Sequence, residues 1–406
     1  MNPMKHHKLI GAILLVTGTT VGAGMLALPV SSGMSGFFPS LIIFVAIWAL
    51  MLYTAFLMLE ATMWMGKDKN LISMAQQTLG LPGKILAWGA YLFLLYLLNI
   101  AYISGGSKML TDAIKIFSGI SIPEWAGALP FLLIFGSFVY AGTKAIDYLN
   151  RIFMMGLFFT YGLIILFVTP HIDKTMLYEH NYTSLPLAIS VIVTAFGFHI
   201  IIPTLVTYLD RDVKKIRTAI FIGSVMPLLA YIFWQFMMLG VVPIEGETGI
   251  IAAWKAGDSI IRPLQAIIAN PWVSLTSSFL AFFVIVTSFL GVAISLVDFL
   301  SDGLRVKKTP SGKIILLAAA FIPSLLVVLT YPRAFLSALG YAGAFGVVIL
   351  LCLLPAAMVW SGRYRMNLGA ENRTPGGRIA LVIVIVISFA IMAFEIAQKA
   401  GWLTIL

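Results

Sequence analysis

Residues 17–24, with the sequence Thr-Gly-Thr-Thr-Val-Gly-Ala-Gly, interrupt an apolar stretch that is long enough to cross a membrane. The stretch runs from Leu9 to Val30, and about 20 apolar residues span the roughly 30 Å hydrocarbon core of a bilayer. Glycine weakens a helix by about 1 kcal/mol relative to alanine. Irregular backbone at the middle of a membrane persists only where protein surrounds it or where it lines a cavity. The interruption therefore predicts a membrane helix that is broken at a protein-lined site.

The composition indicates a polytopic membrane protein. Of the 406 residues, 60% are hydrophobic and only 10% are charged, and the mean hydropathy is +1.01. A soluble domain of this length could not cover so much apolar surface. The first apolar run has no small-residue cleavage site after it, so we expect a retained helix and not a signal peptide. The apolar runs predict 11 transmembrane helices, at about 9–30, 37–60, 85–107, 126–142, 150–170, 185–208, 217–242, 271–298, 313–331, 334–360 and 379–398.

The net charge of +10 reflects topology and does not indicate a nucleic-acid partner. Most lysines and arginines fall in alternate connections between the runs, which is the positive-inside pattern. It predicts a cytoplasmic N-terminus, a C-terminus on the opposite, periplasmic side, and the lipid bilayer as the surrounding partner. Cys352 is the only cysteine, which excludes a disulfide within the chain and argues against a metal site or a cofactor bound through thiols.

A second interruption, at residues 194–203, lies in the sixth apolar run. Gly197 weakens the helix there, and Pro203 removes a backbone donor and clashes with the preceding turn. Because five crossings separate the two interruptions, the first and sixth spans enter the membrane from opposite sides. This matches transporters built from inverted repeats. We expect one domain over residues 1–406, with repeats at about 9–170 and 185–360 and an extra helix at about 379–398.

An interrupted helix offers polar backbone groups that suit an amino-acid zwitterion. Freed carbonyls accept hydrogen bonds from an ammonium group, and the amides that start the next half-helix favour a carboxylate. We expect the carboxylate at the amides of Val21 to Gly24, and the ammonium near the carbonyls of Thr17, Gly18 and Ala195. The pair Gly18 and Gly22 is also typical of close helix packing. The predicted backbone site comprises Thr17, Gly18, Thr19, Thr20, Val21, Gly22, Ala23, Gly24, Ala195, Phe196, Gly197 and Phe198.

Aromatic and amide side chains are candidates for recognising the rest of the ligand. Tyr96 and Asn99 are three residues apart and share one helix face, which can point into a pocket. Tyrosines can also anchor a span at the membrane interface. Phe196 and Phe198 can flank an aromatic ligand, although packing in the core explains them nearly as well.

Three polar residues inside apolar runs are candidates for coupling or gating. His199 is the only histidine within an apolar run, and histidine titrates near neutral pH. It can relay protons, or it can be a neutral side chain that bonds one helix to another. Thr287 and Ser288 fit a cation site or a bond between helices equally well.

Charged residues near the ends of the runs have separate interpretations. Asp147 and Arg151 start the fifth run, and we interpret them as an inner-gate or interface ion pair. Glu60 and Glu395 also lie near run ends, where a solvated carboxylate is the simplest expectation.

Several stretches carry a resemblance to a known family, at residues 18–29, 101–105, 196–199, 227–235, 287–293 and 331–343. Together they resemble the bacterial hydroxy and aromatic amino acid permeases. The resemblance implies a LeuT-like fold of 5+5 inverted spans plus one, and proton-driven import of an aromatic amino acid across the inner membrane. Tyrosine is the first expected substrate and tryptophan the second, with serine, threonine or a broader range as the alternative. The family can carry a lysine in the middle of span 5, where residues 156–159 here have no charge, so Na⁺ remains open as the coupling ion.

Two other classes of protein fit the sequence poorly. An integral-membrane enzyme needs converging catalytic groups, and no metalloprotease helix, aspartate dyad or phosphate-binding glycine loop occurs in the sequence. A channel needs a filter with rings of carbonyls or charges, which nothing in the sequence indicates. We therefore expect a carrier and not an enzyme.

Overall fold

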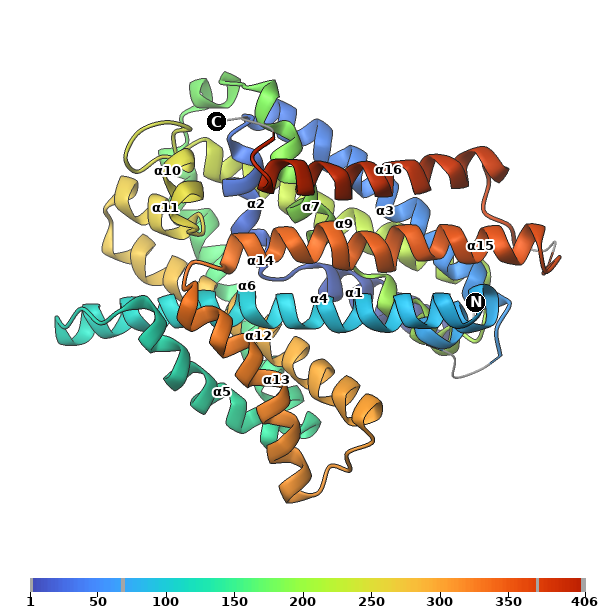
Figure 1. Ribbon diagram of the computed structural model, residues 1–406. Coiled ribbons are helices and arrows are strands. Elements are labelled where there is room, and N and C mark those ends of the chain that lie inside the picture. The colour runs from blue at the N-terminus through green and yellow to red at the C-terminus, as the bar shows by residue number, and fades with distance from the viewer. Residues whose placement is uncertain (1–2, 67–69, 370–371, 403–406) are drawn as a thin grey trace.

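The computed structural model describes residues 3–66, 70–369 and 372–402, and these residues form an all-helical protein (Figure 1). Within these ranges the only β pairing is an isolated bridge between Gly36 and His180. The predicted single domain over residues 1–406 also includes residues 1–2, 67–69, 370–371 and 403–406, which lie outside the described part.

The helices follow one another with short connections. The α-helices are α1 (Pro3–Thr20), α2 (Gly24–Gly33), α3 (Phe37–Met63), α4 (Leu71–Ser118), α5 (Ala128–Ala141), α6 (Thr143–Val168), α7 (Ile189–Ala195), α8 (Ile202–Tyr208), α9 (Val213–Leu239), α10 (Ile250–Ala256), α11 (Ile261–Ile268), α12 (Pro271–Leu304), α13 (Pro310–Thr330), α14 (Phe335–Tyr341), α15 (Leu354–Tyr364) and α16 (Gly377–Lys399). Short 3₁₀ helices are η1 (Glu124–Gly127), η2 (Thr169–His171), η3 (Lys174–Tyr178), η4 (Tyr182–Ala188) and η5 (His199–Ile201), and η6 (Ala342–Leu353) is a π-helix.

The number of membrane-spanning segments agrees with the sequence. In the described part, 10 helical segments are each long and apolar enough to cross a membrane, and α1 with α2 brings the number to 11 if that bent pair is one span. The segment Phe335–Tyr364, which joins α14, η6 and α15, has 78% of its most apolar window buried, against 22% for Thr143–His171. The former is therefore central in the bundle and the latter is peripheral.

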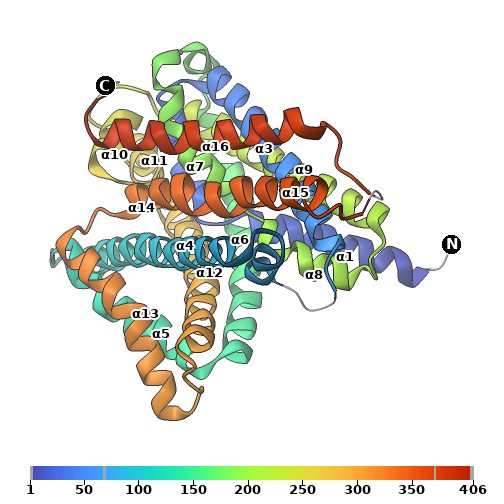
Figure 2. The same cartoon turned by 45° about the vertical axis from the view of Figure 1, so that its right-hand side comes forward.

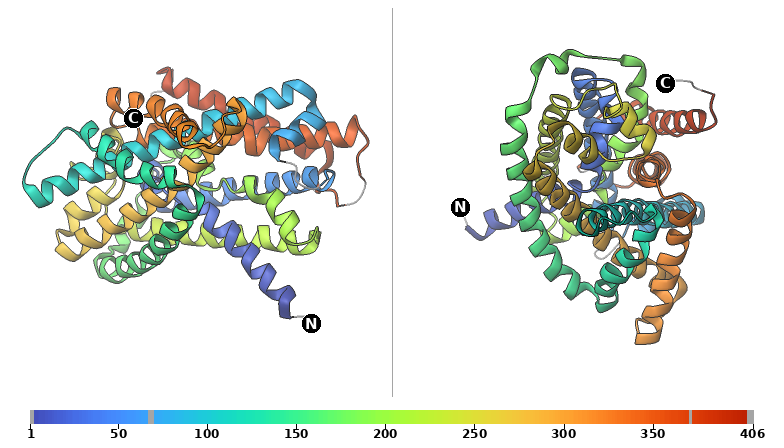
Figure 3. Two further views of the ribbon diagram at one scale, coloured as in Figure 1. Left: turned by 90° about the horizontal axis from the view of Figure 1, so that it is seen from below. Right: turned by 90° about the vertical axis from the view of Figure 1, so that its left-hand side faces the viewer.

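The bundle has two ends that are easily recognised. In Figures 1 and 2, α3, α4, α15 and α16 run side by side, with the N-terminus at one end and α10 and α11 at the other. We call these the N-terminal end and the α10/α11 end. Two further views show the same separation of the N-terminus from the segment that carries α10 and α11 (Figure 3).

Local sequence explains where the long helices begin and bend. Asn70 and Ser73 form a reciprocal capping box at the start of α4, which satisfies amides that lack a partner within the helix. Inside α4, Gly80 has φ of 73° and kinks the helix, a conformation that glycine adopts without steric cost. Asp212 caps α9 by accepting a hydrogen bond from the amide of Lys215. Both helices thus begin with first-turn amides that are satisfied by a side chain.

Candidate substrate-binding site

The first interruption lies between α1 and α2. Helix α1 ends at Thr20, α2 begins at Gly24, and the two helices are bent by 57°. The amide of Val21 still donates to the carbonyl of Thr17 at 3.0 Å, and the next bonds, from Met25 to Gly22 and from Leu26 to Ala23, span only three residues. The regular α-helical pattern is thus lost over Val21 to Ala23.

The second interruption lies between α7 and α8. Helix α7 ends at Ala195, and the chain passes through the 3₁₀ helix η5 before α8 begins at Ile202. Pro203 occupies the first turn of α8, where its missing amide hydrogen costs least. The second interruption therefore covers Phe196 to Ile201.

The two interruptions meet in the interior of the bundle. Gly24 lies so close to the end of α7 that a Cβ on Gly24 would be 3.2 Å from the Cβ of Ala195. The buried side chain of Tyr231, from α9, joins the same two segments. Its hydroxyl lies 2.7 Å from the carbonyl oxygen of Thr20 and 3.2 Å from that of Ala195. Because a hydroxyl has one hydrogen to donate, the two carbonyls share a single donor.

Helix α12 closes another side of this meeting point. The amide of Ala23 donates a hydrogen bond to Ser288 Oγ at 3.2 Å, and a Cβ on Gly22 would lie 3.3 Å from the same oxygen. Thr287, by contrast, bonds back to the carbonyls of Phe283 and Val284 in its own helix. Of the two hydroxyl candidates in α12, only Ser288 is placed at the interruption.

The remaining residues of the first interruption have different surroundings. Thr17 bonds the carbonyls of Ile13 and of Gly223 in α9, which fastens α1 to α9. Gly18 and Thr19 are exposed, and nothing lies within 4 Å of where a Cβ on Gly18 would be. The close-packing interpretation of Gly18 therefore has no contact to support it here.

Both phenylalanines of the second interruption lie in the core. Phe196 is fully buried and packs edge-on against the ring of Tyr231, with centroids 5.4 Å apart. Phe198 is 1% exposed and lies against the ring of His199. Phe196 therefore borders the meeting point through Tyr231, whereas the ring contact of Phe198 is with His199.

Tyr96 and Asn99 share a face, as predicted, but that face is turned toward α13. The Tyr96 hydroxyl donates to the carbonyl of Ala319 at 2.7 Å. The Asn99 side chain donates to the carbonyl of Ala320 and to Ser324 Oγ, at 3.2 and 3.0 Å. In this structure the two side chains join α4 to α13 and do not reach the interruptions.

His199 lies within the second interruption, but its side chain bonds to α3, and Asp147 and Arg151 lie in α6. His199 is fully buried, and its Nε2 lies 2.9 Å from Thr54 Oγ1 in α3, as a side chain that bonds two helices does. Arg151 pairs with Asp147 at 2.9 Å within α6, and their side chains are 76% and 60% exposed. The contacts of this pair stay on the surface of one helix.

Sequence reasoning missed Tyr231 as a site residue. A tyrosine in the middle of an apolar run, four residues after Pro227, was the available signal.

The expectation that Glu60 and Glu395 are solvated carboxylates is wrong, since the two residues are 2% and 5% exposed. Their burial follows from neighbouring helices that the sequence of one span does not reveal.

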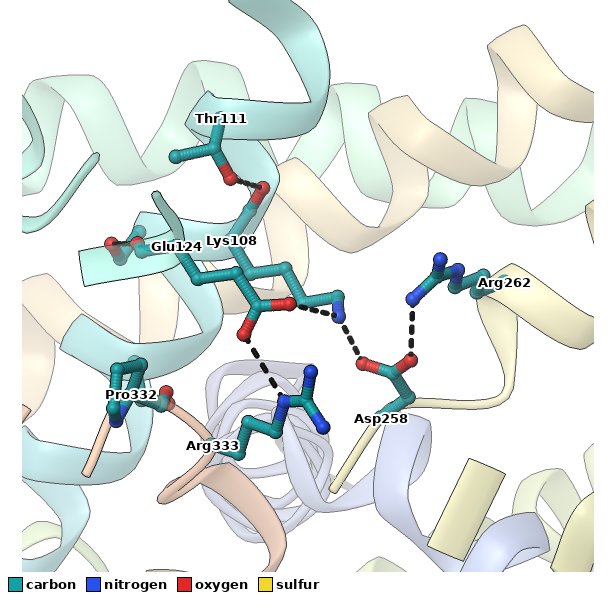
Figure 4. Close-up of polar contacts among 9 residues, drawn as sticks. Lys108, Thr111, Glu124, Asp258, Arg262, Pro332 and Arg333 are labelled. Carbon is teal, nitrogen blue, oxygen red and sulfur yellow. Dashed lines mark hydrogen bonds and ion pairs between the residues drawn. The ribbon is translucent and has the colours of Figure 1, made fainter. Parts of the chain in front are cut away.

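A network of charged side chains lies at the α10/α11 end of the bundle (Figure 4). Lys108 of α4 pairs with Asp258, which also pairs with Arg262 of α11 at 3.1 Å. Glu124 joins Lys108 to Arg333, at 3.4 Å from each. The segment between α10 and α11, which carries Asp258, also contacts α2, because the amide of Ile260 donates to the carbonyl of Leu26. The connection between α10 and α11 is thus tied to α2 by its backbone and to α4 by the ion pair of Asp258.

The sequence matches the tryptophan/tyrosine permease family over residues 5–395. The chain belongs to this family. Similar proteins in Haemophilus influenzae include the tyrosine-specific transport systems 2 and 1. They are 32% and 34% identical to this chain over 405 and 403 residues, and the matches cover 99% and 98% of both chains. The tryptophan-specific transport protein of the same organism is 30% identical over 417 residues, covering 99% of each chain. These relatives are named as transporters, and the resemblance predicted from the sequence is confirmed.

Proposed function

We propose that this permease imports an aromatic amino acid together with a proton across the bacterial inner membrane, with tyrosine as the first substrate and tryptophan as the second. The observation that carries the proposal is the meeting of the two interrupted segments at Tyr231, in a family whose similar members are named for tyrosine and tryptophan transport. Interrupted helices near the membrane midplane are typical of substrate sites in secondary transporters.

The backbone at the meeting point suits both ends of a zwitterion. The carbonyls of Thr20 and Ala195 share one hydroxyl hydrogen, and a carbonyl oxygen has two lone pairs, so each retains capacity for an ammonium group. The amides that begin α2 lie at the positive end of a ten-residue helix, which favours a carboxylate. We place the ammonium at Thr20 and Ala195, and the carboxylate at the amides of Gly22 and Gly24, since the amide of Ala23 already donates to Ser288.

We further propose that α1 with α2, and η4, α7 and α8 together, are the first spans of two inverted repeats of LeuT-like architecture. Two observations support this assignment: each of the two spans is interrupted in the interior of the bundle, and the two interruptions are in contact. In this arrangement the N-terminal end faces the cytoplasm and the α10/α11 end faces the periplasm, as the distribution of basic residues predicts.

Uptake by purified protein in liposomes tests the proposed function. An inward proton gradient should drive accumulation of labelled tyrosine, and unlabelled tryptophan should compete with it. Exchange of labelled for unlabelled tyrosine should occur without any gradient. If neither uptake nor exchange of an aromatic amino acid occurs, while serine or threonine is transported, the substrate assignment is wrong.

Gly22→Val tests whether the first interruption forms the site. Its side chain would extend toward Ser288, since even a Cβ comes within 3.3 Å of Ser288 Oγ, and we expect tyrosine exchange to fall at least tenfold. Gly162→Val is the matched control, because nothing lies within 4 Å of a Cβ at Gly162 in α6. Unchanged exchange in Gly22→Val would give Gly22 a packing role only.

A further inference from the structure

Glu395 is a buried carboxylate in α16, the helix that has no counterpart in the two proposed repeats. The residue is 5% exposed, although it lies one turn before the end of the helix. Ionisable side chains inside a membrane-spanning segment are costly and are usually functional. Glu395 takes no part in the proposed substrate site.

The contacts of Glu395 connect α16 to the interrupted helix α7. Ser190 Oγ donates a hydrogen bond to Glu395 Oε2 at 2.7 Å. Ser190 lies five residues before Ala195, where α7 ends at the meeting point. The other carboxylate oxygen faces Gly340 of α14, where an added Cβ would be 3.5 Å from Oε1. A change in the charge of this carboxylate therefore directly changes its hydrogen bond to α7.

A cavity of about 510 Å³ gives Glu395 access to the α10/α11 end of the bundle. It is lined by Glu395 and Ser190 and also by side chains from the α10 region and from the connection that precedes α14. Its polar lining can hold water, which provides a route for protons. Among those lining residues are Trp254, Lys255, Tyr331 and Arg333.

The charged groups around this cavity do not neutralise Glu395 by direct contact. Among the ion pairs of residues 3–66, 70–369 and 372–402, none includes Glu395. Lys399, one turn further along α16, lies over the ring of Tyr341 at 5.3 Å. The part of α7 that faces Glu395 contributes a hydroxyl, and the π-helix η6 has no charged residue. Helix α15 also packs on α16, but its Tyr364 lies beside Arg378 at the start of α16. The titratable groups that face the carboxylate are thus Tyr341, Tyr331, Lys255, Arg333 and Lys399.

We propose that Glu395 is the proton-binding site of this transporter, and that its protonation controls the contact between α16 and α7. The inference rests on the proposed transport function and names its coupling residue. A proton that arrives through the cavity joins one carboxylate oxygen and converts the anion to a neutral acid, and the same proton is released when the acid ionises. The ionised form accepts the hydrogen of Ser190, whereas the neutral acid binds that hydroxyl more weakly. Protonation thus weakens the hydrogen bond that joins α16 to α7, the helix that ends at Ala195.

Glu395→Gln, which resembles the neutral acid, tests the proposal in liposomes that contain the full-length protein. We expect accumulation driven by the proton gradient to fall at least tenfold, while gradient-free exchange of labelled tyrosine continues. The matched control is Asp298→Asn, which removes a half-exposed carboxylate paired with Lys308 and should leave accumulation unchanged. Accumulation that persists in Glu395→Gln overturns the proposal, as does wild-type accumulation that needs a Na⁺ gradient and not a proton gradient.

Ser190→Ala keeps the carboxylate and so tests the site even if Glu395→Gln fails to fold. Loss of a hydrogen bond to the ionised form favours the neutral form. The pH at which uptake is half-maximal should therefore rise by roughly one unit. An unchanged pH profile overturns the proposal. Absence of both uptake and exchange in the wild type would instead remove the proposed function.

Discussion

Glu60 and Glu395 are both buried glutamates near the end of a span, but they lie at opposite ends of the bundle. Glu60 has a positively charged partner, whereas the partner of Glu395 is neutral. Glu60, toward the N-terminal end, receives two hydrogen bonds from Arg363, at 2.7 and 2.6 Å, and a third from the amide of Thr374 at 2.6 Å. Glu395, toward the α10/α11 end, receives one from the hydroxyl of Ser190. Burial alone therefore does not tell what a membrane carboxylate does.

The difference follows from what each carboxylate holds together. Glu60 fixes α3 to α15 and to the segment before α16 through a cation whose side chain is 3% exposed. A buried pair of this kind resists separation, because each charge would be left without its partner. Glu395 has a neutral partner and an adjoining cavity, so it can change its charge at lower cost. The first arrangement suits a fixed joint and the second suits a switch.

Arg363→Met should have the largest effect on stability. It leaves Glu60 buried without its counter-charge, which costs about 3–5 kcal/mol. Thermal unfolding in detergent measures the loss, and the double variant with Glu60→Gln should recover much of it. The comparison fails if Arg363→Met is no more destabilising than Glu395→Gln.

Asp258→Asn should have an intermediate effect at the α10/α11 end. Its carboxylate is 5% exposed and pairs with Lys108 and Arg262, and hydrogen bonds to charged groups contribute about 1.5–3 kcal/mol. Hydrogen exchange at the amides of residues 257–261 should become faster. High salt should reduce the difference from the wild type, because Arg262 is 68% exposed and exposed charges are screened. A salt-independent difference would contradict the interpretation that the loss arises from the ion pairs of Asp258.

Asp212→Asn should have the smallest effect, because Asp212 is a carboxylate outside the spans. Hydrogen bonds from the side chain and the amide of Lys215 lower the pKa of Asp212. The charged form therefore stabilises the fold above the unfolded-state pKa of about 3.9, and this stabilisation is lost as the pH falls through the lower folded-state pKa. Thermal unfolding at pH 7 should show a loss below about 1 kcal/mol. A similar loss at pH 2 would show that charge is not its cause.

Much of the fold could be predicted because spans and interruptions are local properties. Eleven apolar runs correspond to the ten long helical segments and the bent pair of α1 and α2. Gly22 and Gly24 mark the loss of regular helix in the first interruption, and Gly197 and Pro203 lie in and just after the second. Residues close in sequence decide such features, since glycine and proline act on their own turn of helix.

The candidate site could be predicted only in its backbone. Thr20 and Gly24 lie near Ala195, whereas Thr17 bonds to α9 and Gly18 is exposed. The face of α4 that carries Asn99 turns toward α13, and the ring of His199 turns toward Thr54. Tyr231 reaches the site from a helix that had suggested no role. The direction of a polar side chain depends on which helices pack beside it, and one helix's sequence does not contain that information.

By itself, then, the sequence determined the family, the membrane spans and the places where two helices lose their regular backbone, because hydropathy and helix propensity act along the chain. The tertiary structure decided that the two interruptions share the hydroxyl of Tyr231 and that Glu60 is neutralised by Arg363. It also decided that Glu395 has only Ser190 as a hydrogen-bond partner among the residues that the structure describes. Those outcomes depend on helices packed from distant parts of the chain, where a low dielectric makes each polar partner count.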